Sequence, residues 1–301
     1  GLINTHHHFY QTLTRAWAPV VNQPLFPWLK TLYPVWAKLT PNALSLACDV
    51  ALAELLLSGC TTTTDHHYLF PIGMEDAIDV QVDSVKRMGM RALLTRGSMS
   101  LGEDEGGLPP RHTVQTGDEI LQDSQRLIST YHERGDGAWL QIALAPCSPF
   151  SVTQEIMADS AKLAEAEDVR LHTHLAETLD EEDFCLKMFG MRTVDYLESV
   201  GWLSSRTWLA HGIHFNDDEA LFSLVSQNSL TPHVCFPADN SLLILENLRQ
   251  RAPWLVSSIV LTRLDLAPDF ESLISALEVV GAQVDCVTGC APSEWNQEQS
   301  D

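Results

Sequence analysis

The chain has 301 residues, 45% of them hydrophobic, which is enough for a large buried core. Its formal net charge of -22 argues against a nucleic-acid partner and against docking on an anionic membrane, because both need clustered Lys and Arg. No apolar run is long enough to cross a bilayer and no secretion signal opens the chain, so we expect a cytoplasmic protein.

The seven cysteines are consistent with that compartment. They are an odd number and widely scattered, and the closest pair, Cys286 and Cys290, lacks the second pair of a zinc knuckle. We therefore expect reduced, mostly buried cysteines. Because the chain begins with Gly and directly on a strand-like run, we also expect it to be a fragment.

Short apolar and β-branched runs recur along the chain, and segments with helix signals separate them. These signals include Thr40-Pro41, an N-cap followed by proline, Thr178 with Glu181 as a capping box, and an acidic helix start at Asn216. Eight strands alternating with helices predict an α/β fold, a (β/α)8 barrel of the TIM type. The predicted strands are Gly1–His6, Cys60–Asp65, Met90–Gly97, Leu140–Pro146, Val169–His174, Thr207–His211, Thr231–Phe236 and Val256–Asp265.

Two long insertions follow strand ends. Residues 11–39 are rich in Trp, Pro and Leu, and residues 101–116 are rich in Gly, Glu and Pro. In a barrel, both insertions lie over the C-terminal face of the strands, where such folds place their active sites.

Three consecutive histidines, His6, His7 and His8, end the first predicted strand. Side chains alternate across a strand, so His6 and His8 point the same way and His7 points the other way. Two of the three can therefore hold one metal ion, while His7 packs behind them. The alternative, a purification-tag remnant, is weaker because a tag is normally longer and does not follow an apolar strand.

Two further strand ends carry histidine. The stretch LHTHLAET places His172 and His174 on one face of a strand end, with Glu177 three residues beyond His174. The stretch WLAHGIHFND places His211 at the end of the next strand. A lone histidine at a strand end is more often structural, but three such ends converge on one face in a closed barrel, which indicates a metal site.

Several stretches together resemble a known family. GLINTHHHFYQTLTR, GCTTTTDHHYLFP, LHTHLAET and LAHGIHFND resemble the amidohydrolase superfamily, in its mononuclear-metal aminohydrolase branch. RGSMSLGEDEGGLPP and ALAPCSPFSV are most similar to the 8-oxoguanine deaminases, which are often labelled hydroxydechloroatrazine ethylaminohydrolases. The resemblance runs from Gly1 to about Glu219 and fades beyond it.

The resemblance implies one divalent ion, Zn²⁺, held by His6, His8 and His174, with Glu177 as acid/base carboxylate and His211 orienting the water. Neutral imidazoles suit zinc, which lowers the pKa of bound water to about 7. The implied reaction is hydrolytic deamination of an oxidised purine such as 8-oxoguanine, a small-molecule substrate, with release of ammonia. An s-triazine aminohydrolase or chlorohydrolase is the alternative enzyme.

Other metal sites fit less well. Binuclear members of the superfamily bridge their metals with a modified lysine on the fourth strand, and the corresponding stretch LQIALAP has no lysine. The cytidine-deaminase signature, H-x-E with P-C-x-x-C, is also absent.

The chain departs from the family at the eighth strand, where an aspartate should be the fourth metal ligand and accept a proton from water. By chain order Asp265 is the best substitute and Asp269 a weaker one, although both are equally well explained as turn acids. A catalytically dead or truncated amidohydrolase scaffold without this aspartate is therefore the alternative of a different class.

The family also builds a small flanking β-sandwich from residues before the first strand and after the eighth. This chain starts too late and ends too early for it, so we expect the sandwich to be missing and the barrel to be distorted or incomplete after strand 6. We assign residues 1–290 to the metal-dependent hydrolase barrel and residues 291–301 to a polar tail.

Two residues are candidates for substrate binding, although packing explains each at least as well. Gln11, three residues after His8, can present an amide to a purine edge, and Cys147 follows the fourth strand, where it can line the pocket. For His66 and His67, after the second strand, hydrogen-bonded structural roles are favoured. Homo-oligomerisation is implied by the resemblance alone.

Overall fold

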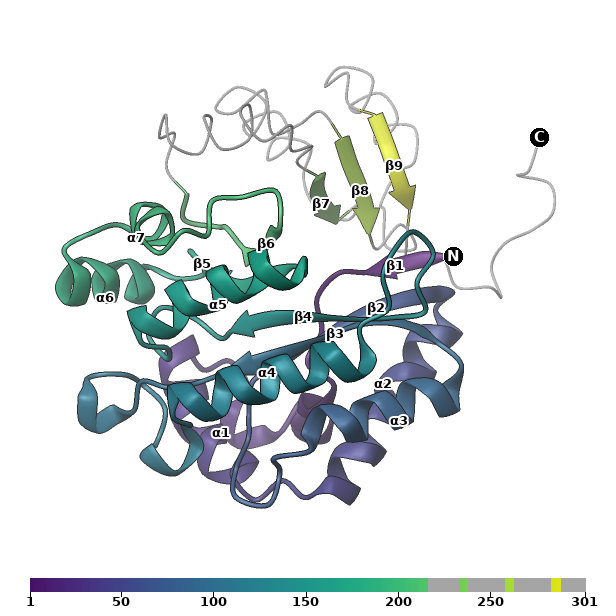
Figure 1. The fold of residues 1–301 in the computed structure, drawn as a ribbon, viewed down its shortest axis with the longest axis horizontal. Helices are drawn as coiled ribbons and strands as arrows, with labels where there is room; N and C mark the ends of the chain where they lie inside the picture. The colour runs from purple at the N-terminus through teal and green to yellow at the C-terminus, as the bar shows by residue number, and fades with distance from the viewer. Residues whose placement is uncertain (216–232, 238–257, 263–282, 288–301) are drawn as a thin grey trace. The chain divides into compact units, whose positions relative to one another are not determined.

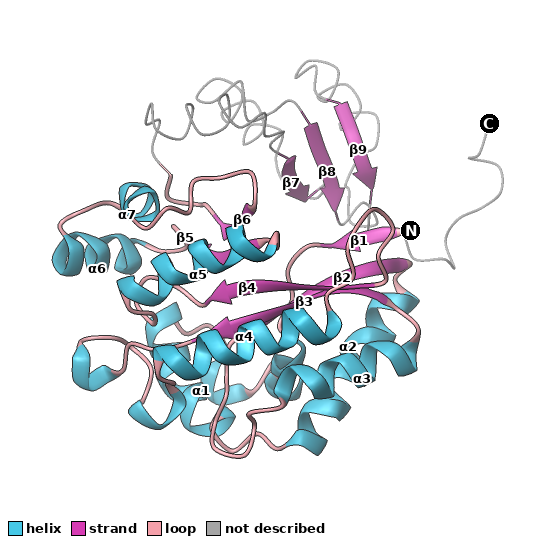
Figure 2. Ribbon diagram, in the orientation of Figure 1, coloured by secondary structure: helices cyan, strands magenta, loops and turns pink. Residues whose placement is uncertain are grey.

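The structure is a computed structural model that describes residues 1–215, 233–237, 258–262 and 283–287. The chain divides into two compact units, Gly1–Phe215 and Asn216–Asp301. In the first unit, strands and helices alternate along the chain as the sequence predicts (Figures 1 and 2).

A six-stranded parallel sheet forms the centre of the first unit, in the order β1-β2-β3-β4-β5-β6. Parallel neighbours need a crossover connection, which the intervening helices supply. Both faces of such a sheet are covered, which explains near-continuous apolar runs such as LQIALAP in β4, of which only Gln141 is not buried. The strands are β1 (Leu2–Asn4), β2 (Cys60–His67), β3 (Arg91–Ser98), β4 (Leu140–Pro146), β5 (Leu171–Leu175) and β6 (Thr207–His211).

The helices of this unit cover the sheet. Figures 1 and 2 show α3 and α4 running alongside β2, β3 and β4. Val82 and Leu127 on these two helices and Leu94 and Ile142 on the strands are fully buried in the shared core. The α-helices are α1 (Leu25–Trp36), α2 (Pro41–Leu57), α3 (Ala77–Met88), α4 (Gly117–Tyr131), α5 (Gln154–Glu167), α6 (Leu179–Phe189) and α7 (Thr193–Ser199).

Two of the three predicted helix starts are present, one of them with a correction. Thr40 caps α2 by accepting a hydrogen bond from the Ala43 N–H at 3.3 Å. Thr178 likewise accepts from the Glu181 N–H at 3.4 Å, but the predicted capping box is incomplete because the Glu181 carboxylate binds other main-chain groups. The predicted acidic helix start at Asn216 lies outside the described residues.

The two insertions lie beside the strand ends as short helical turns. Residues 11–39 include α1 and the 3₁₀ turns η1 (Phe9–Thr14) and η2 (Ala18–Val20), and residues 101–116 include η3 (Glu103–Glu105) and η4 (Arg111–Thr113). The buried Arg96 anchors the second insertion, because its guanidinium donates to Asp123 at 2.8 Å and to Gln115 at 2.9 Å.

The second unit contributes three described strands, which form a parallel sheet in the order β7-β8-β9. Strand β7 (His233–Pro237) overlaps the seventh predicted strand and β8 (Ser258–Thr262) lies within the eighth, whereas β9 (Gln283–Val287) was not predicted. Asp265, Asp269 and the predicted polar tail, residues 291–301, lie outside the described residues.

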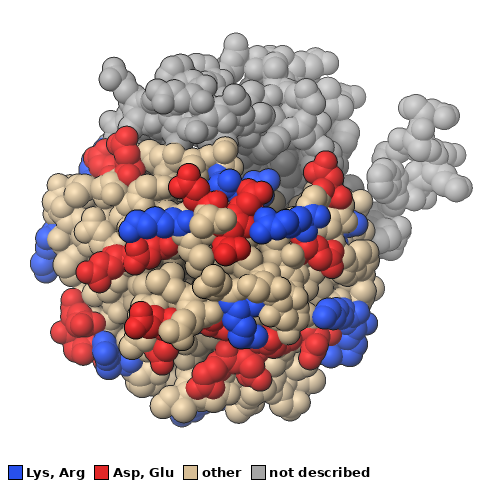
Figure 3. Space-filling model, viewed as in Figure 1, with Lys and Arg blue, Asp and Glu red and all other residues tan. Residues whose placement is uncertain are grey.

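The surface of the first unit carries both signs of charge. On the face shown in Figure 3, Lys and Arg side chains lie next to Asp and Glu side chains. Typical pairs are Arg126 with Asp79 at 2.7 Å and Arg87 with Asp49 at 2.6 Å. Among the described residues, no helix has the length and apolar character needed to span a bilayer.

Candidate metal centre and active site

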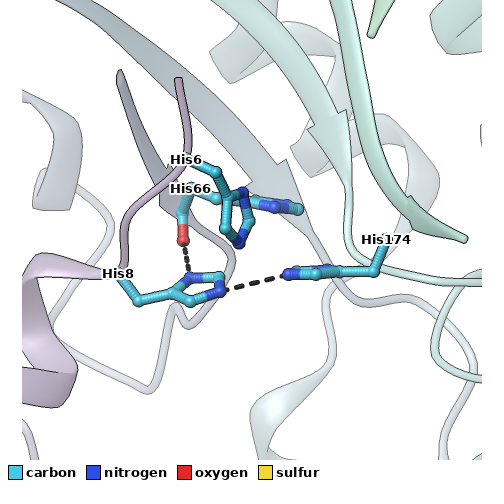
Figure 4. A group of neighbouring side chains, drawn as sticks. All are labelled: His6, His8, His66 and His174. Atoms are coloured by element: carbon cyan, nitrogen blue, oxygen red, sulfur yellow. Dashed lines mark hydrogen bonds between the residues drawn. The ribbon is translucent and has the colours of Figure 1, made fainter. Parts of the chain in front are cut away.

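Four histidines from three strand ends gather in the first unit. His6 and His8 follow β1, His66 lies on β2 and His174 on β5, and each offers a ring nitrogen within 4.8 Å of the others. Figure 4 shows the rings of His6, His8 and His174 pointing toward one another from separate parts of the chain. The structure thus brings together the three predicted ligands and adds His66.

The tautomers of His8 and His174 follow from their hydrogen bonds. The Nδ1–H of His8 donates to the main-chain oxygen of His66 at 2.7 Å, and the Nδ1–H of His174 donates to that of Cys147 at 2.7 Å. Because a carbonyl oxygen can only accept, both Nε2 atoms must carry lone pairs. These two atoms face each other at 3.1 Å, where neither has a proton to donate. A cation between them would satisfy both.

A relay of hydrogen bonds orients His6 in the same way. His172 donates from Nδ1 to the main-chain oxygen of Trp208 at 2.8 Å, so its Nε2 accepts the Nδ1–H of His6 at 2.8 Å. The Nε2 of His6 is therefore left with its lone pair. Partners of this kind fix the orientation of metal-binding histidines in proteins. His172 is stacked on the Trp208 indole, with ring centroids 4.2 Å apart.

Burial keeps these imidazoles neutral, as metal ligands must be. Burial first, and then the neighbouring imidazoles His172, His211 and His7, lower the pKa of His6 to about 3. Burial also lowers the pKa of His8 and His174 well below its usual range. Three neutral imidazoles with converging lone pairs therefore fit a divalent metal ion.

His66 is the fourth member of the cluster by distance, but its ring orientation differs. Its ring lies nearly parallel to that of His174, with an interplanar angle of 11° and centroids 4.4 Å apart. An ion in the plane of the His174 ring lies off the plane of the His66 ring, so His66 cannot direct a lone pair at it in this rotamer. His66 donates from Nε2 to the Ala145 oxygen at 3.0 Å and forms a wall of the site.

Glu177 and His211 lie beside the cluster. The Nε2 of His211 is 3.3 Å from a carboxylate oxygen of Glu177, and the His211 ring packs 5.3 Å from that of His174. Burial raises the pKa of Glu177 to about 7. His211 has a φ of 77°, a left-handed conformation that is uncommon for a residue with a Cβ and often marks functional sites. Burial lowers the pKa of His211, so the pair joins a carboxyl with a raised pKa to an imidazole with a lowered one.

A cavity of about 410 Å³ adjoins the histidine cluster. It is lined by His7 and His8, by Gln11, and by aromatic and aliphatic residues of the first insertion, including Trp17 and Trp28. The Gln11 amide contacts the hydroxyls of Tyr10 and Tyr68 at 3.4 Å. Gln11 thus lines a cavity next to the histidine cluster, and its role in substrate binding stays a prediction.

Cys147 lies behind the histidine cluster, next to His174. It is not among the residues that line this cavity, and its thiol is buried beside Ser148 and Ser151. Its contribution to the site is the main-chain oxygen that orients His174. Cys147 is one of four cysteines in the described part of the chain that are free and buried, together with Cys48, Cys60 and Cys185.

The part that His66, His172 and Asp65 play in the site was not predicted from the sequence. Alternation along CTTTTDHH places His66 and His67 on opposite faces, yet nothing in the stretch shows which one faces the cluster. His172 was recognised on the same face as His174, but not as a partner of His6. Asp65, fully buried, accepts the Phe9 N–H at 2.6 Å and fixes the chain just after His8.

Residues 1–289 match the amidohydrolase family, and the chain therefore belongs to this family. It is 77% identical over 219 residues to an 8-oxoguanine deaminase from Pseudomonas aeruginosa, covering 73% of this chain and 49% of that protein. It is 36% identical over 218 residues to a hydroxydechloroatrazine ethylaminohydrolase from Pseudomonas sp. (strain ADP), covering 71% of this chain and 45% of that protein. The chain thus spans about half the length of the curated relatives it matches.

Solved structures agree with this assignment. An atrazine chlorohydrolase from Arthrobacter aurescens TC1, complexed with zinc, has a TM-score of 0.73 and 29% identity, over 96% of this chain and 59% of that chain. A triazine hydrolase from the same genus has a TM-score of 0.70 and 28% identity, with the same coverage. The family and the fold class, an α/β barrel of which β1–β6 form a parallel half, are thus confirmed.

Proposed function

We propose that the protein is a zinc-dependent deaminase that hydrolyses an oxidised purine such as 8-oxoguanine. One observation carries the proposal: three Nε2 lone pairs, of His6, His8 and His174, converge beside a carboxylate with a pKa near 7. The purine is chosen because the 77% identical relative is an 8-oxoguanine deaminase, whereas the triazine relative is 36% identical.

The three histidines would hold one Zn²⁺, and Asp265 is our candidate for the fourth ligand. When bound there, zinc would act as a Lewis acid and favour ionisation of water near neutral pH. The net reaction exchanges a C–NH2 group and water for a carbonyl group and ammonia. The chain's own residues must therefore place the ring, take a proton from water and deliver protons to the ring nitrogen and the leaving amine.

Glu177 is suited to move those protons. A carboxyl with a pKa of about 7 is populated in both protonation states at neutral pH, as a group that must first accept and then donate a proton requires. His211, 3.3 Å from the Glu177 oxygen, would keep that oxygen directed at the reacting atoms and orient the water.

The cavity of the first insertion would hold the substrate ring. Trp17 and Trp28 offer flat apolar surfaces, and the Gln11 amide can both donate to and accept from a purine edge. We propose that Cys147 supports this site through His174 rather than by touching the ring.

We place the protein in the cytoplasm, because its described cysteines are free and its composition is strongly acidic. Homo-oligomerisation remains a prediction that rests on the resemblance. The absence of nucleic-acid and membrane partners remains a prediction that rests on the composition.

The test combines metal analysis with ammonia release from 8-oxoguanine, guanine and a hydroxylated s-triazine. We expect one zinc per chain and turnover of 8-oxoguanine, abolished by Glu177→Gln with metal retained. Turnover of the triazine alone would transfer the assignment to the triazine hydrolases. Metal binding without any ammonia release would identify an inactive scaffold.

The same assays decide the role of Asp265. If it is the fourth ligand, Asp265→Asn should remove the activity while leaving the fold intact, and Asp269→Asn is the matched control. Equal activity of Asp265→Asn and the unsubstituted chain would eliminate Asp265.

A further inference from the structure

Glu181 has two hydrogen bonds that a helix-capping role does not explain. Its side chain is fully buried in the first turn of α6. One carboxylate oxygen accepts the N–H of Ala176 and the other accepts the N–H of Glu177, each at 2.9 Å. A capping box would have directed the carboxylate at the Thr178 N–H. Here it reaches further back, to the turn that carries Glu177.

That turn is strained. Ala176 has a φ of 53°, in the left-handed region, where a residue with a Cβ is disfavoured and is held only by its surroundings. The two N–H groups bound by Glu181 lie on either side of the Ala176 Cα. The carboxylate therefore holds the left-handed conformation from both sides.

The same turn is joined to the end of β6. The main-chain oxygen of Ala176 accepts from the His214 N–H at 2.9 Å, and that of Leu175 accepts from the Gly212 N–H at 2.9 Å. His211, which contacts Glu177, lies directly before these donors. The turn thus fixes the acid/base carboxylate and its histidine partner as one assembly.

We propose that Glu181 is a positioning residue, which sets the direction of the Glu177 side chain by holding the Ala176 turn. The proposal rests on the proposed function in giving Glu177 the proton-transfer role. Without the Glu181 carboxylate, Ala176 relaxes toward an ordinary φ and rotates Glu177 away from His211. His174, two residues before Ala176, is held separately because its Nδ1–H donates to the Cys147 main-chain oxygen at 2.7 Å, so we expect metal binding to be retained.

An acidic residue near a helix N-terminus also stabilises the helix through the helix dipole, and this simpler role must be distinguished from the positioning role. Glu182 supplies the control, because it lies in the same turn of α6 but its carboxylate pairs with Arg192 and Thr193. Glu181→Asp supplies a second comparison: it keeps the charge at the helix start but is too short to reach both amides.

The experiment uses the full chain with Glu181→Gln, Glu181→Asp and Glu182→Gln. Gln keeps the length of Glu181 but offers one acceptor oxygen instead of two. For both Glu181 variants we expect faster hydrogen exchange at the amides of Ala176 and Glu177, with unchanged zinc content. We also expect kcat to fall by about a hundredfold while KM stays within about threefold, because misplacing a reacting group by about 1 Å lowers the rate by about this much. Glu182→Gln should match the unsubstituted chain.

Two results would overturn the proposal. One is unchanged amide exchange in the Glu181 variants. The other is full kcat in Glu181→Asp, which would assign Glu181 to the helix dipole. If the unsubstituted chain releases no ammonia, the proposed function fails on its own, and a crystal structure of Glu181→Gln then decides the positioning role. The distance from His211 Nε2 to Glu177 Oε2, now 3.3 Å, should lengthen; an unchanged distance refutes it.

Discussion

His6, His7 and His8 are adjacent in the sequence, but they differ in what their ring nitrogens face. The Nε2 atoms of His6 and His8 turn into the cluster, whereas His7 lines the cavity and its buried Nδ1 has no hydrogen-bond partner among the described residues. His6→Ala should therefore remove the bound metal, measured by atomic emission after gel filtration. His7→Ala, the matched control, should retain it. Loss of metal from His7→Ala alone would reverse this assignment.

The relay through His172 makes a second prediction at this scale. Replacing His172 by Phe keeps a ring against Trp208 but removes the acceptor for the His6 Nδ1–H. Loss of such a supporting partner typically weakens metal binding about 10- to 100-fold. Zinc affinity measured by competition with a chelating dye should fall by that factor. His132→Phe, another histidine bonded to a main-chain group, is the control. Equal affinities for the two variants would refute the relay.

Residue types in the site were readable from the sequence, but their partners were not. The H-x-H spacing drew attention to His6 and His8, although the strand alternation on which that argument rests ends at Asn4 and the two histidines lie in the loop after β1. The pairing of His6 with His172 joins positions 166 residues apart, which no local pattern records. Sequence likewise gave no sign that Cys147 contacts His174, through its main-chain oxygen at 2.7 Å and its thiol sulfur at 3.9 Å.

At the scale of elements, Asp65 connects three parts of the fold. From β2, its carboxylate accepts the Phe9 N–H after β1 and the Gln81 side-chain N–H of α3 at 2.5 Å. Asp65→Ala leaves two buried donors unpaired, at about 1–3 kcal/mol each. We expect urea unfolding to show a loss of about 2–6 kcal/mol, and zinc affinity to fall as the segment of His8 loosens.

Asp49→Ala is the matched control for this variant. Asp49 is paired with Arg87 in a partly exposed salt bridge, a type that contributes about 1 kcal/mol or less. A loss for Asp65→Ala no larger than that for Asp49→Ala would show that the Phe9 and Gln81 hydrogen bonds contribute little to stability.

Element positions were predicted better than element ends. All eight predicted strands occur, because runs of β-branched and apolar residues between helix signals are a local property. The first strand, however, ends at Asn4 and not at His6, since the Asn4 side chain accepts the His6 N–H at 3.0 Å and turns the chain. The ninth strand, Gln283–Val287, was not predicted. Its run, QVDCV, is short and comes after the eight strands that complete the predicted barrel.

At the scale of the molecule, the division at Phe215 lies close to the point near Glu219 where the family resemblance fades. We expected a barrel that is incomplete after strand 6 because the family's sequence motifs are not recognisable beyond this point. The three described strands of the second unit pair with one another in a sheet of their own. Sequence could not supply the fourth ligand, because a single carboxylate in an apolar run carries no signal of what it faces.

The many buried neutral groups of the first unit predict how its stability depends on pH. Burial lowers the pKa of His6, His67 and His172 to about 3, and lowers that of His8, His66 and His174 in the same direction. Such histidines take up protons on unfolding, so their contribution is present above about pH 6.5 and is lost as the pH falls toward 3. Three buried carboxyls act in the opposite sense. Burial raises the pKa of Asp65, Glu177 and Glu181 to about 7, so their contribution is lost as the pH rises from about 4.5 to 7.

The histidines outnumber the carboxyls by two to one, so their effect dominates between about pH 5 and 6. Unfolding then takes up protons on balance, so the free energy of unfolding falls as the pH falls. Urea unfolding of metal-free protein, followed by tryptophan fluorescence, should therefore show a free energy of unfolding that falls steeply from pH 6.5 to pH 5. His67→Phe, which removes one such histidine outside the metal cluster, should flatten the slope by about 1.4 kcal/mol per pH unit. Stability that is constant or rises on acidification over this interval would mean that the cluster is already protonated in the folded state, which would also remove the lone pairs on which metal binding depends.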